Sequence, residues 1–517
     1  MIPEEIRYLK HLRYLMIERV TSCHATRLPR SLSNLYHLLY IIYDGSWRLI
    51  YPQDGDFLPC DISNLSNLRY LELPKTCISS ICGIEKLKSL QELNMFAIRD
   101  VSGYRIGELE NMNDLCKLGI NCLENVKDAE EARSAKLCEK RRLTNLYLSW
   151  SRGAGLTDSR NNDLAENVLD NLQPPKCLRN LHIAWYPGAR YAKWMNNVNS
   201  ILNLEKIELE CGKWETLPPF GQLRFLKSLK LFGMPKVKWL ESKFNGNDKY
   251  RAFPLLKELW IGRLEALEDW FEAGVAAEDG CLFPCLTVLW LYNCPKLKEL
   301  PTLPSEVESL TIDNNMEWTT LNFRSNSNPI PLQTLNIIDC PNITSISLER
   351  FAALRKLEIR KCPNLISLGE MQTSNNCHIM LSDLEISDPS VLLMEPLRSI
   401  ASLKRLCVWQ NDGLVSFPNE AEQWFLNVRS SLSKLRFQYL KSLESLPFSL
   451  ESLSSLQSLY IKDVSMLREL PNLPPSLERL GIHGKCHSEL KERYREDGGS
   501  DRHKIAHIPH ISIDPEK

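Results

Sequence analysis

The stretch Leu286-Thr287-Val288-Leu289-Trp290-Leu291 carries the spacing that decides the fold, Leu-x-x-Leu-x-Leu. We refer to the middle leucine of each copy as its anchor. Further copies, some with Ile or Met in the last place, begin at Leu12, Leu68, Leu90, Leu226, Leu256, Leu354 and Leu456. Counted in this way, 19 anchors lie between Leu15 and Leu480, at a mean spacing of about 26 residues.

This period lies within the band of roughly 20–29 residues that is typical of leucine-rich repeats. In x-Leu-x-Leu-x the apolar side chains alternate, as a half-buried strand requires. One repeat cannot bury its own apolar face, so neighbouring repeats must stack. The sequence therefore predicts an α/β leucine-rich-repeat solenoid, a curved horseshoe. A parallel β-sheet should line its concave face, with loops, short helices or 3-10 turns on the convex side.

The repeats also set the expected domain organisation. Residues 1–485 should form the solenoid of about 19 irregular repeats, and residues 486–517 a C-terminal capping segment and tail. Several repeats place Cys-Pro five residues past the anchor, where a small side chain turns the chain inward and Pro ends strand pairing. We expect buried, inert thiols at Cys294, Cys340 and Cys362.

Composition excludes several classes of protein. Lys and Arg number 63 against 64 Asp and Glu, without a basic stripe, so a nucleic-acid partner is not expected. No apolar run is long enough to span a bilayer, and the acidic N-terminus does not resemble a signal peptide. The 17 cysteines are scattered rather than dense, which favours a reducing, cytoplasmic location over a disulfide framework.

The sequence offers no enzyme or cofactor machinery. His503, His507 and His510 cluster near the C-terminus, but Pro509 interrupts any helix there, and paired zinc-ligand cysteines are missing. We interpret this cluster as a polar terminal cap and expect no metal. No Gly-x4-Gly-Lys-Ser/Thr loop occurs in the chain, so the backbone cradle that holds nucleotide phosphates is not present.

A series of motifs between the repeats resembles a known family. In order along the chain, it includes Ile106-Gly107-Glu108-Leu109, Leu123-Glu124-Asn125-Val126, Leu217-Pro218-Pro219-Phe220 and Lys504-Ile505-Ala506-His507. The series resembles the leucine-rich-repeat region of plant intracellular coiled-coil nucleotide-binding leucine-rich-repeat disease-resistance proteins. The resemblance implies recognition of a pathogen effector or a guarded host protein. It also implies restraint of a nucleotide-binding module, intramolecular or separate, and a cytoplasmic location with the nucleus as the alternative.

Three other interpretations stay open at this point. They are a nonfunctional truncated resistance-gene fragment, a leucine-rich-repeat adaptor of a ubiquitin ligase, and a receptor ectodomain. An adaptor would need an F-box or catalytic domain, for which the chain has no room. An ectodomain predicts a signal peptide, paired capping cysteines and a regular Gly-x-Ile-Pro repeat ending, and none of these is seen.

Aromatic residues recur at fixed positions relative to the anchors and form the candidate partner-binding site. The set comprises Tyr147, Trp150, His182, Trp185, Trp260, Trp290, Tyr292 and Tyr460. Parallel strands lie about 4.8 Å apart, so Trp260 and Trp290 should stand side by side, with Tyr292 nearby. Tyr147, Trp150, His182 and Trp185 should form a second cluster, with charged Lys206, Glu208 and Lys230 between the two. An aromatic centre with a charged surround is typical of a protein interface, although the same aromatics could merely cover neighbouring leucines.

Overall fold

The computed structural model describes most of the chain. It covers residues 2–18, 28–44, 58–59, 61–73, 75–152, 159–240, 252–270, 283–301, 303–315, 317–321, 330–348, 351–369 and 380–514. These residues fall into two compact units, the first ending at Pro284 and the second beginning at Cys285. None of the described helices is both long and apolar enough to cross a membrane.

The first unit is built on strands that pair in chain order, every pair parallel. They are β1 (Tyr14–Glu18), β2 (Tyr40–Asp44), β3 (Tyr70–Glu72), β4 (Glu92–Ala97), β5 (Lys117–Asn121), β6 (Asn145–Ser149), β7 (Asn180–Tyr186), β8 (Lys206–Cys211), β9 (Ser228–Phe232) and β10 (Glu258–Gly262). The helices are α1 (Lys75–Ile78), α2 (Ala129–Ser134), α3 (Ser159–Asn171) and α4 (Lys193–Asn196). Short 3-10 turns complete the repeats: η1 (Glu4–Tyr8), η2 (Arg30–Asn34), η3 (Ile62–Asn64), η4 (Ile84–Lys86), η5 (Ile106–Leu109), η6 (Leu123–Asn125), η7 (Leu137–Glu139), η8 (Val198–Ser200) and η9 (Phe220–Gln222).

The second unit repeats this plan with another parallel series in chain order. Its strands are β11 (Val288–Tyr292), β12 (Ser309–Asp313), β13 (Thr334–Ile338), β14 (Lys356–Arg360), β15 (Asp383–Ile386), β16 (Arg405–Trp409), β17 (Lys434–Gln438), β18 (Ser458–Lys462), β19 (Arg479–His483) and β20 (His510–Ile513). Its described helical segments are α6 (Asn419–Asn427), α7 (Ser488–Tyr494), η11 (Pro389–Leu393), η12 (Leu397–Ser399), η13 (Phe448–Ser452) and η14 (Arg502–Ile505).

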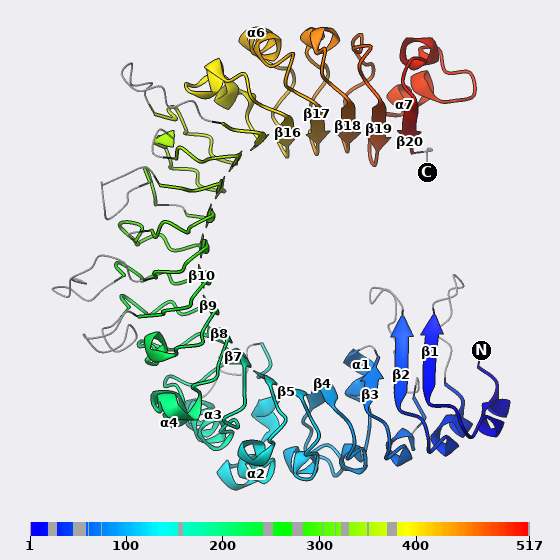
Figure 1. The fold of residues 1–517 in the computed structure, drawn as a ribbon, viewed down its shortest axis with the longest axis vertical. Coiled ribbons are helices and arrows are strands. Elements are labelled where there is room, and N and C mark those ends of the chain that lie inside the picture. The colour runs from blue at the N-terminus through cyan, green and yellow to red at the C-terminus, as the bar shows by residue number, and fades with distance from the viewer. Residues whose placement is uncertain are drawn as a thin grey trace. The chain divides into compact units, whose positions relative to one another are not determined.

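The core of each unit is the stack of anchors. Leu229, Leu289 and Leu357 are fully buried, and in β11 every second side chain is buried. Within each unit, the strands lie along one side, and helices such as α3 and α6 lie on the opposite side (Figure 1). The predicted parallel strands, the alternation and the leucine-rich-repeat solenoid are therefore confirmed. Side chains at odd offsets from an anchor form what we call the strand face.

Most strands of the second unit end in the same way. The residue four positions past the anchor adopts a left-handed conformation at Asn293, Asn314, Asp339, Lys361, Gln410, Tyr439, Asp463 and Gly484, with φ between 50° and 71°. The next residue turns into the core: Cys294 and Cys340 are fully buried and Cys362 is 7% exposed. The backbone N–H of Cys294 donates to Asn315 Oδ1 at 2.7 Å. The prediction of buried thiols at these positions is confirmed.

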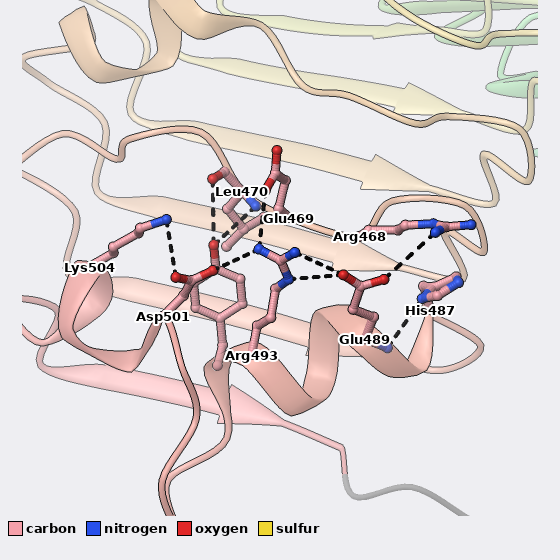
Figure 2. Close-up of polar contacts among 9 residues, drawn as sticks. Arg468, Glu469, Leu470, His487, Glu489, Arg493, Asp501 and Lys504 are labelled. Atoms are coloured by element: carbon pink, nitrogen blue, oxygen red, sulfur yellow. Dashed lines mark hydrogen bonds and ion pairs between the residues drawn. The ribbon is translucent and has the colours of Figure 1, made fainter.

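The C-terminal segment adds a strand beyond the last predicted repeat. Strand β20 pairs in parallel with β19, and Arg493 of α7 lies between two carboxylates (Figure 2). Its guanidinium lies 2.8 Å from Glu489 and 3.1 Å from Asp501. His507 Nε2 lies 3.2 Å from the carbonyl oxygen of Pro474. These contacts support the proposal that residues 486–517 cap the solenoid.

Candidate binding surface

A row of side chains crosses five neighbouring strands of the first unit. Tyr147, His182, Glu208, Lys230 and Trp260 each stand one residue past an anchor, on β6 to β10. Tyr147 pairs with His182 and His182 with Glu208. Lys230 pairs with Glu208 on one side and Trp260 on the other. We call these five residues the aromatic–charged row.

The contacts run along most of this row. The rings of Tyr147 and His182 meet edge to face, with centroids 4.7 Å apart. His182 Nε2 lies 3.8 Å from Glu208 Oε1, and Lys230 Nζ lies 4.6 Å from the centre of the Trp260 ring. The structure therefore joins Tyr147 and His182, as predicted, and places the predicted charged residues directly between them and Trp260.

The row is half-buried rather than fully exposed. The His182 side chain is 35% exposed and that of Glu208 40%. Burial lowers the pKa of His182, and Lys230 acts in the same direction, against the opposing effect of Glu208. His182 is therefore mainly neutral at neutral pH, so its ring can both donate and accept a hydrogen bond.

A hollow of about 470 Å³ lies over four members of this row, Tyr147, His182, Glu208 and Lys230. Its lining also includes polar residues directly before the anchors: Lys117, Asn145, Asn180, Lys206, Ser228 and Glu258. Amides, amines and carboxylates of this kind can pair with both the N–H and the C=O groups of a peptide backbone. The hollow therefore suits a polypeptide segment better than an apolar ligand.

Trp150 does not belong to this surface. It is 3% exposed, and its ring packs edge to face on Tyr186 with centroids 4.9 Å apart. The predicted position on the concave face is wrong because Trp150 stands four residues past its anchor. An even offset from an inward side chain also points inward.

Trp185 has the same offset but a different outcome. A left-handed backbone, with φ of 59°, accompanies an irregular register between Ile183 and Tyr186. Tyr186 consequently takes the inward place, and Trp185 is half-buried with Arg152 5.0 Å above its ring. Trp185 therefore lies at the end of β7, beside the aromatic–charged row rather than within it.

The remaining predicted aromatics lie in the second unit. Trp290 and Tyr292 stack on the face of β11, with ring centroids 5.5 Å apart. Tyr460 on β18 packs against His483, with centroids 5.1 Å apart. Trp260 belongs to the first unit and Trp290 to the second, so their juxtaposition stays a prediction.

A second row on the strand face of the second unit was missed. The Arg360 guanidinium lies 4.1 Å above the Trp409 ring, and Trp409 meets Tyr439 edge to face at 5.8 Å. Lys462 Nζ lies 5.4 Å from the Tyr439 ring. Trp409 and Arg360 stand three residues past their anchors, as Tyr292 does, and this offset was the available signal. Together with Tyr292, they line a hollow of about 380 Å³.

Comparison with known proteins supports the family resemblance. Residues 106–234 match the family model described as R13L1/DRL21 LRRs. This chain is a leucine-rich-repeat region similar to those of plant disease-resistance proteins. The putative disease resistance RPP13-like protein 1 of Arabidopsis thaliana is 31% identical over 317 residues, which are 58% of this chain and 30% of that protein. The putative disease resistance protein RGA1 of Solanum bulbocastanum is 32% identical over 290 residues, 56% of this chain and 28% of that protein.

The matched part of this chain thus spans less than a third of the length of these relatives. A solved structure supports the fold alone: a chain in the crystal structure of the TLR13-ssRNA13 complex superposes with a TM-score of 0.50. The superposition covers 98% of this chain and 75% of that chain, at 15% sequence identity.

Proposed function

We propose that this repeat region is the protein-binding part of a plant immune receptor and has no catalytic activity of its own. It recognises a pathogen effector or a guarded host protein and restrains a nucleotide-binding module, in the cytoplasm or the nucleus. The aromatic–charged row carries the proposal, because a partner laid across it meets Tyr147 and Trp260 at its ends and charged groups between them.

The physical basis is the composition of that row. Tyr and Trp are enriched among the residues that dominate binding energy, since they bury a large rigid area at low entropic cost. Glu208 and Lys230 add charge complementarity, which selects among partners more than it raises affinity. The half-buried rings are already held by their neighbours, so little conformational freedom is lost on binding.

The test begins with a panel of purified pathogen effectors and host proteins, measured against the chain by calorimetry. For any partner found, Tyr147→Ala combined with Trp260→Ala should weaken binding by about 2 kcal/mol or more, roughly thirtyfold. Phe225→Ala is the matched control, because Phe225 is 46% exposed in the same unit but precedes β9 rather than lying on the strand face. Its affinity should not change.

An unchanged affinity in the double variant, with an unchanged circular dichroism spectrum, would show that this row does not bind the partner. A panel without any binder would favour the alternative of a nonfunctional resistance-gene fragment. The prediction that Trp260 and Trp290 share one site is tested by a double-mutant cycle on the same partner, in which additive losses would argue for separate sites.

A further inference from the structure

The strand face of the second unit carries a concentration of positive charge on β14 to β17. Its basic residues are Lys356, Arg360, Lys404, Arg405, Lys434 and Arg436, against the three carboxylates of Glu358, Asp383 and Glu385. Lys356, Arg405 and Lys434 start their strands, Lys404 directly precedes β16, and Arg436 stands one residue past its anchor. We call these five basic residues, without Arg360, the basic face.

Two members of the basic face are partly neutralised within the chain. Arg405 forms an ion pair with Asp383, whose other carboxylate oxygen accepts a hydrogen bond from Ser382 at 2.6 Å. Lys356 lies 3.8 Å from Glu358, a buried carboxylate that is also bound by Arg360. Lys404, Lys434 and Arg436 are exposed and form no ion pair with another residue that the structure describes.

Like charges also lie next to one another on the basic face. Lys434 stands opposite Arg405 in the parallel ladder, and like charges at opposed positions of a sheet destabilise it. Lys404 directly precedes Arg405 in the sequence. An anion held between these side chains would convert this repulsion into attraction.

Four of the five residues of the basic face, all but Lys404, line a hollow of about 310 Å³. Its lining combines Leu384, Leu406 and Cys407 with Lys434, Arg436 and the Asp383–Arg405 pair. Burial raises the pKa of the Cys407 thiol to about 12, so Cys407 is uncharged at neutral pH. The hollow therefore has a partly apolar lining and a basic side, and its unpaired cations, Lys434 and Arg436, lie on β17.

We propose that the basic face binds an acidic, extended segment of a partner protein, whose Asp or Glu side chains pair with Lys434 and Arg436. This site goes beyond the proposed function, because it lies in the other unit and uses none of the aromatic–charged row. The interleaved carboxylates of Asp383 and Glu385 favour a peptide over a nucleic acid. A peptide can space its acidic groups to avoid them, whereas a phosphate backbone carries a charge at every step.

The experiment uses the full chain and a fluorescein-labelled peptide in which Asp alternates with Ser, followed by fluorescence anisotropy. Lys434→Glu combined with Arg436→Glu should weaken binding about tenfold or more, because attraction becomes repulsion. Lys434→Gln with Arg436→Gln should give a smaller loss and serves if charge reversal disturbs folding. Lys434→Arg with Arg436→Lys should retain binding.

The matched control makes the same charge change away from the strand face. Arg398→Glu combined with Arg429→Glu alters exposed cations within η12 and just after α6, in the same repeats. An unchanged affinity in this control supports a site on the basic face. An equal loss in both double variants, or none in either, would overturn the proposal. So would an oligouridylate of equal charge that binds more tightly than the peptide and loses its affinity in the Lys434→Glu, Arg436→Glu variant.

Discussion

The lysine at position 140 offers a sharp physical test of the structure. Lys140 is fully buried, and its ammonium group donates to three backbone carbonyls at the end of η5 and just beyond it. These are Leu109 O at 2.6 Å, Met112 O at 3.2 Å and Glu110 O at 3.4 Å. Burial lowers the pKa of Lys140 from 10.5 to about 8. A buried lysine with this pKa makes the stability of the first unit depend on pH in an unusual direction.

The magnitude follows from the two pKa values. Below pH 8 both the folded and the unfolded chain hold the proton, and the folded state bears the full cost of the buried charge, roughly 3 kcal/mol. Between pH 8 and 10.5 the folded chain releases the proton while the unfolded chain still holds it. The unfolded state then binds more protons, so the free energy of unfolding rises with pH.

The perturbation is Lys140→Met, which keeps the length of the side chain and removes its titration. From pH 7 to pH 10, the free energy of unfolding of the wild type should rise by about 2–3 kcal/mol relative to that of the variant. Urea denaturation followed by tryptophan fluorescence measures it, and the other titrating groups cancel in the difference. A difference that is independent of pH, or that moves in favour of the variant, would refute the reasoning.

Lys136→Met is the matched control, with the opposite sign. Lys136 is exposed and forms an ion pair with Glu110 at 2.6 Å. A hydrogen bond and the charge of Glu110 raise the pKa of Lys136. Because this pKa is raised, the ion pair of Lys136 stabilises the fold fully below the ordinary lysine pKa. This stabilisation is lost as the pH rises through the raised pKa. The difference between wild type and this variant should therefore shrink at high pH.

Three further predictions concern the core, the C-terminal segment and the thiols. Trp150→Ala should lower the free energy of unfolding by about 3–5 kcal/mol and Trp185→Ala by much less; equal losses in denaturation would contradict the buried position of Trp150. Arg493→Met should speed amide hydrogen exchange in residues 488–505. Ion pairing holds the pKa values of Asp501 and Glu489 below their usual range. The stabilisation by Arg493 should therefore be lost as the pH falls through these lowered values. An effect of the substitution on exchange that is confined to low pH would contradict this prediction. Burial raises the pKa of Cys340 to about 12. A thiol reagent at neutral pH should therefore modify the exposed Cys82 and Cys138 first. Mass spectrometry measures the order of modification, and early modification of Cys340 would contradict this prediction.

The sequence predicts the fold well because the fold depends on a local period. The spacing of leucines specifies strand, inward face and stacking at once, and anchors such as Leu289 are buried as that spacing requires. Most of the motifs that carry the family resemblance lie between residues 106 and 234, where the family model also matches. The features that recur in every repeat can therefore be predicted from the sequence alone.

The surface was predicted less completely, for two physical reasons. Trp150 was assigned by its offset from the anchor without regard to parity, although an even offset implies burial where the backbone has not turned left-handed, as it has at Trp185. Trp409 and Arg360 were missed because the offset of three was used only for Tyr292, although they share it. Contacts such as that of Lys140 with Leu109 join residues 31 positions apart. They depend on how loops of adjacent repeats meet, which the period does not specify.

The left-handed residue that ends most strands of the second unit also limits the size of its strand face. Because the chain turns away after the fourth position past the anchor, typical strands such as β11 and β16 contain five residues, a width of roughly 17 Å. Each added repeat lengthens the face by about 4.8 Å but leaves that width unchanged. A partner lying along the ladder can thus gain contacts indefinitely in one direction only. Any partner broader than this ribbon must also touch the loops on either side, where repeats differ most in length.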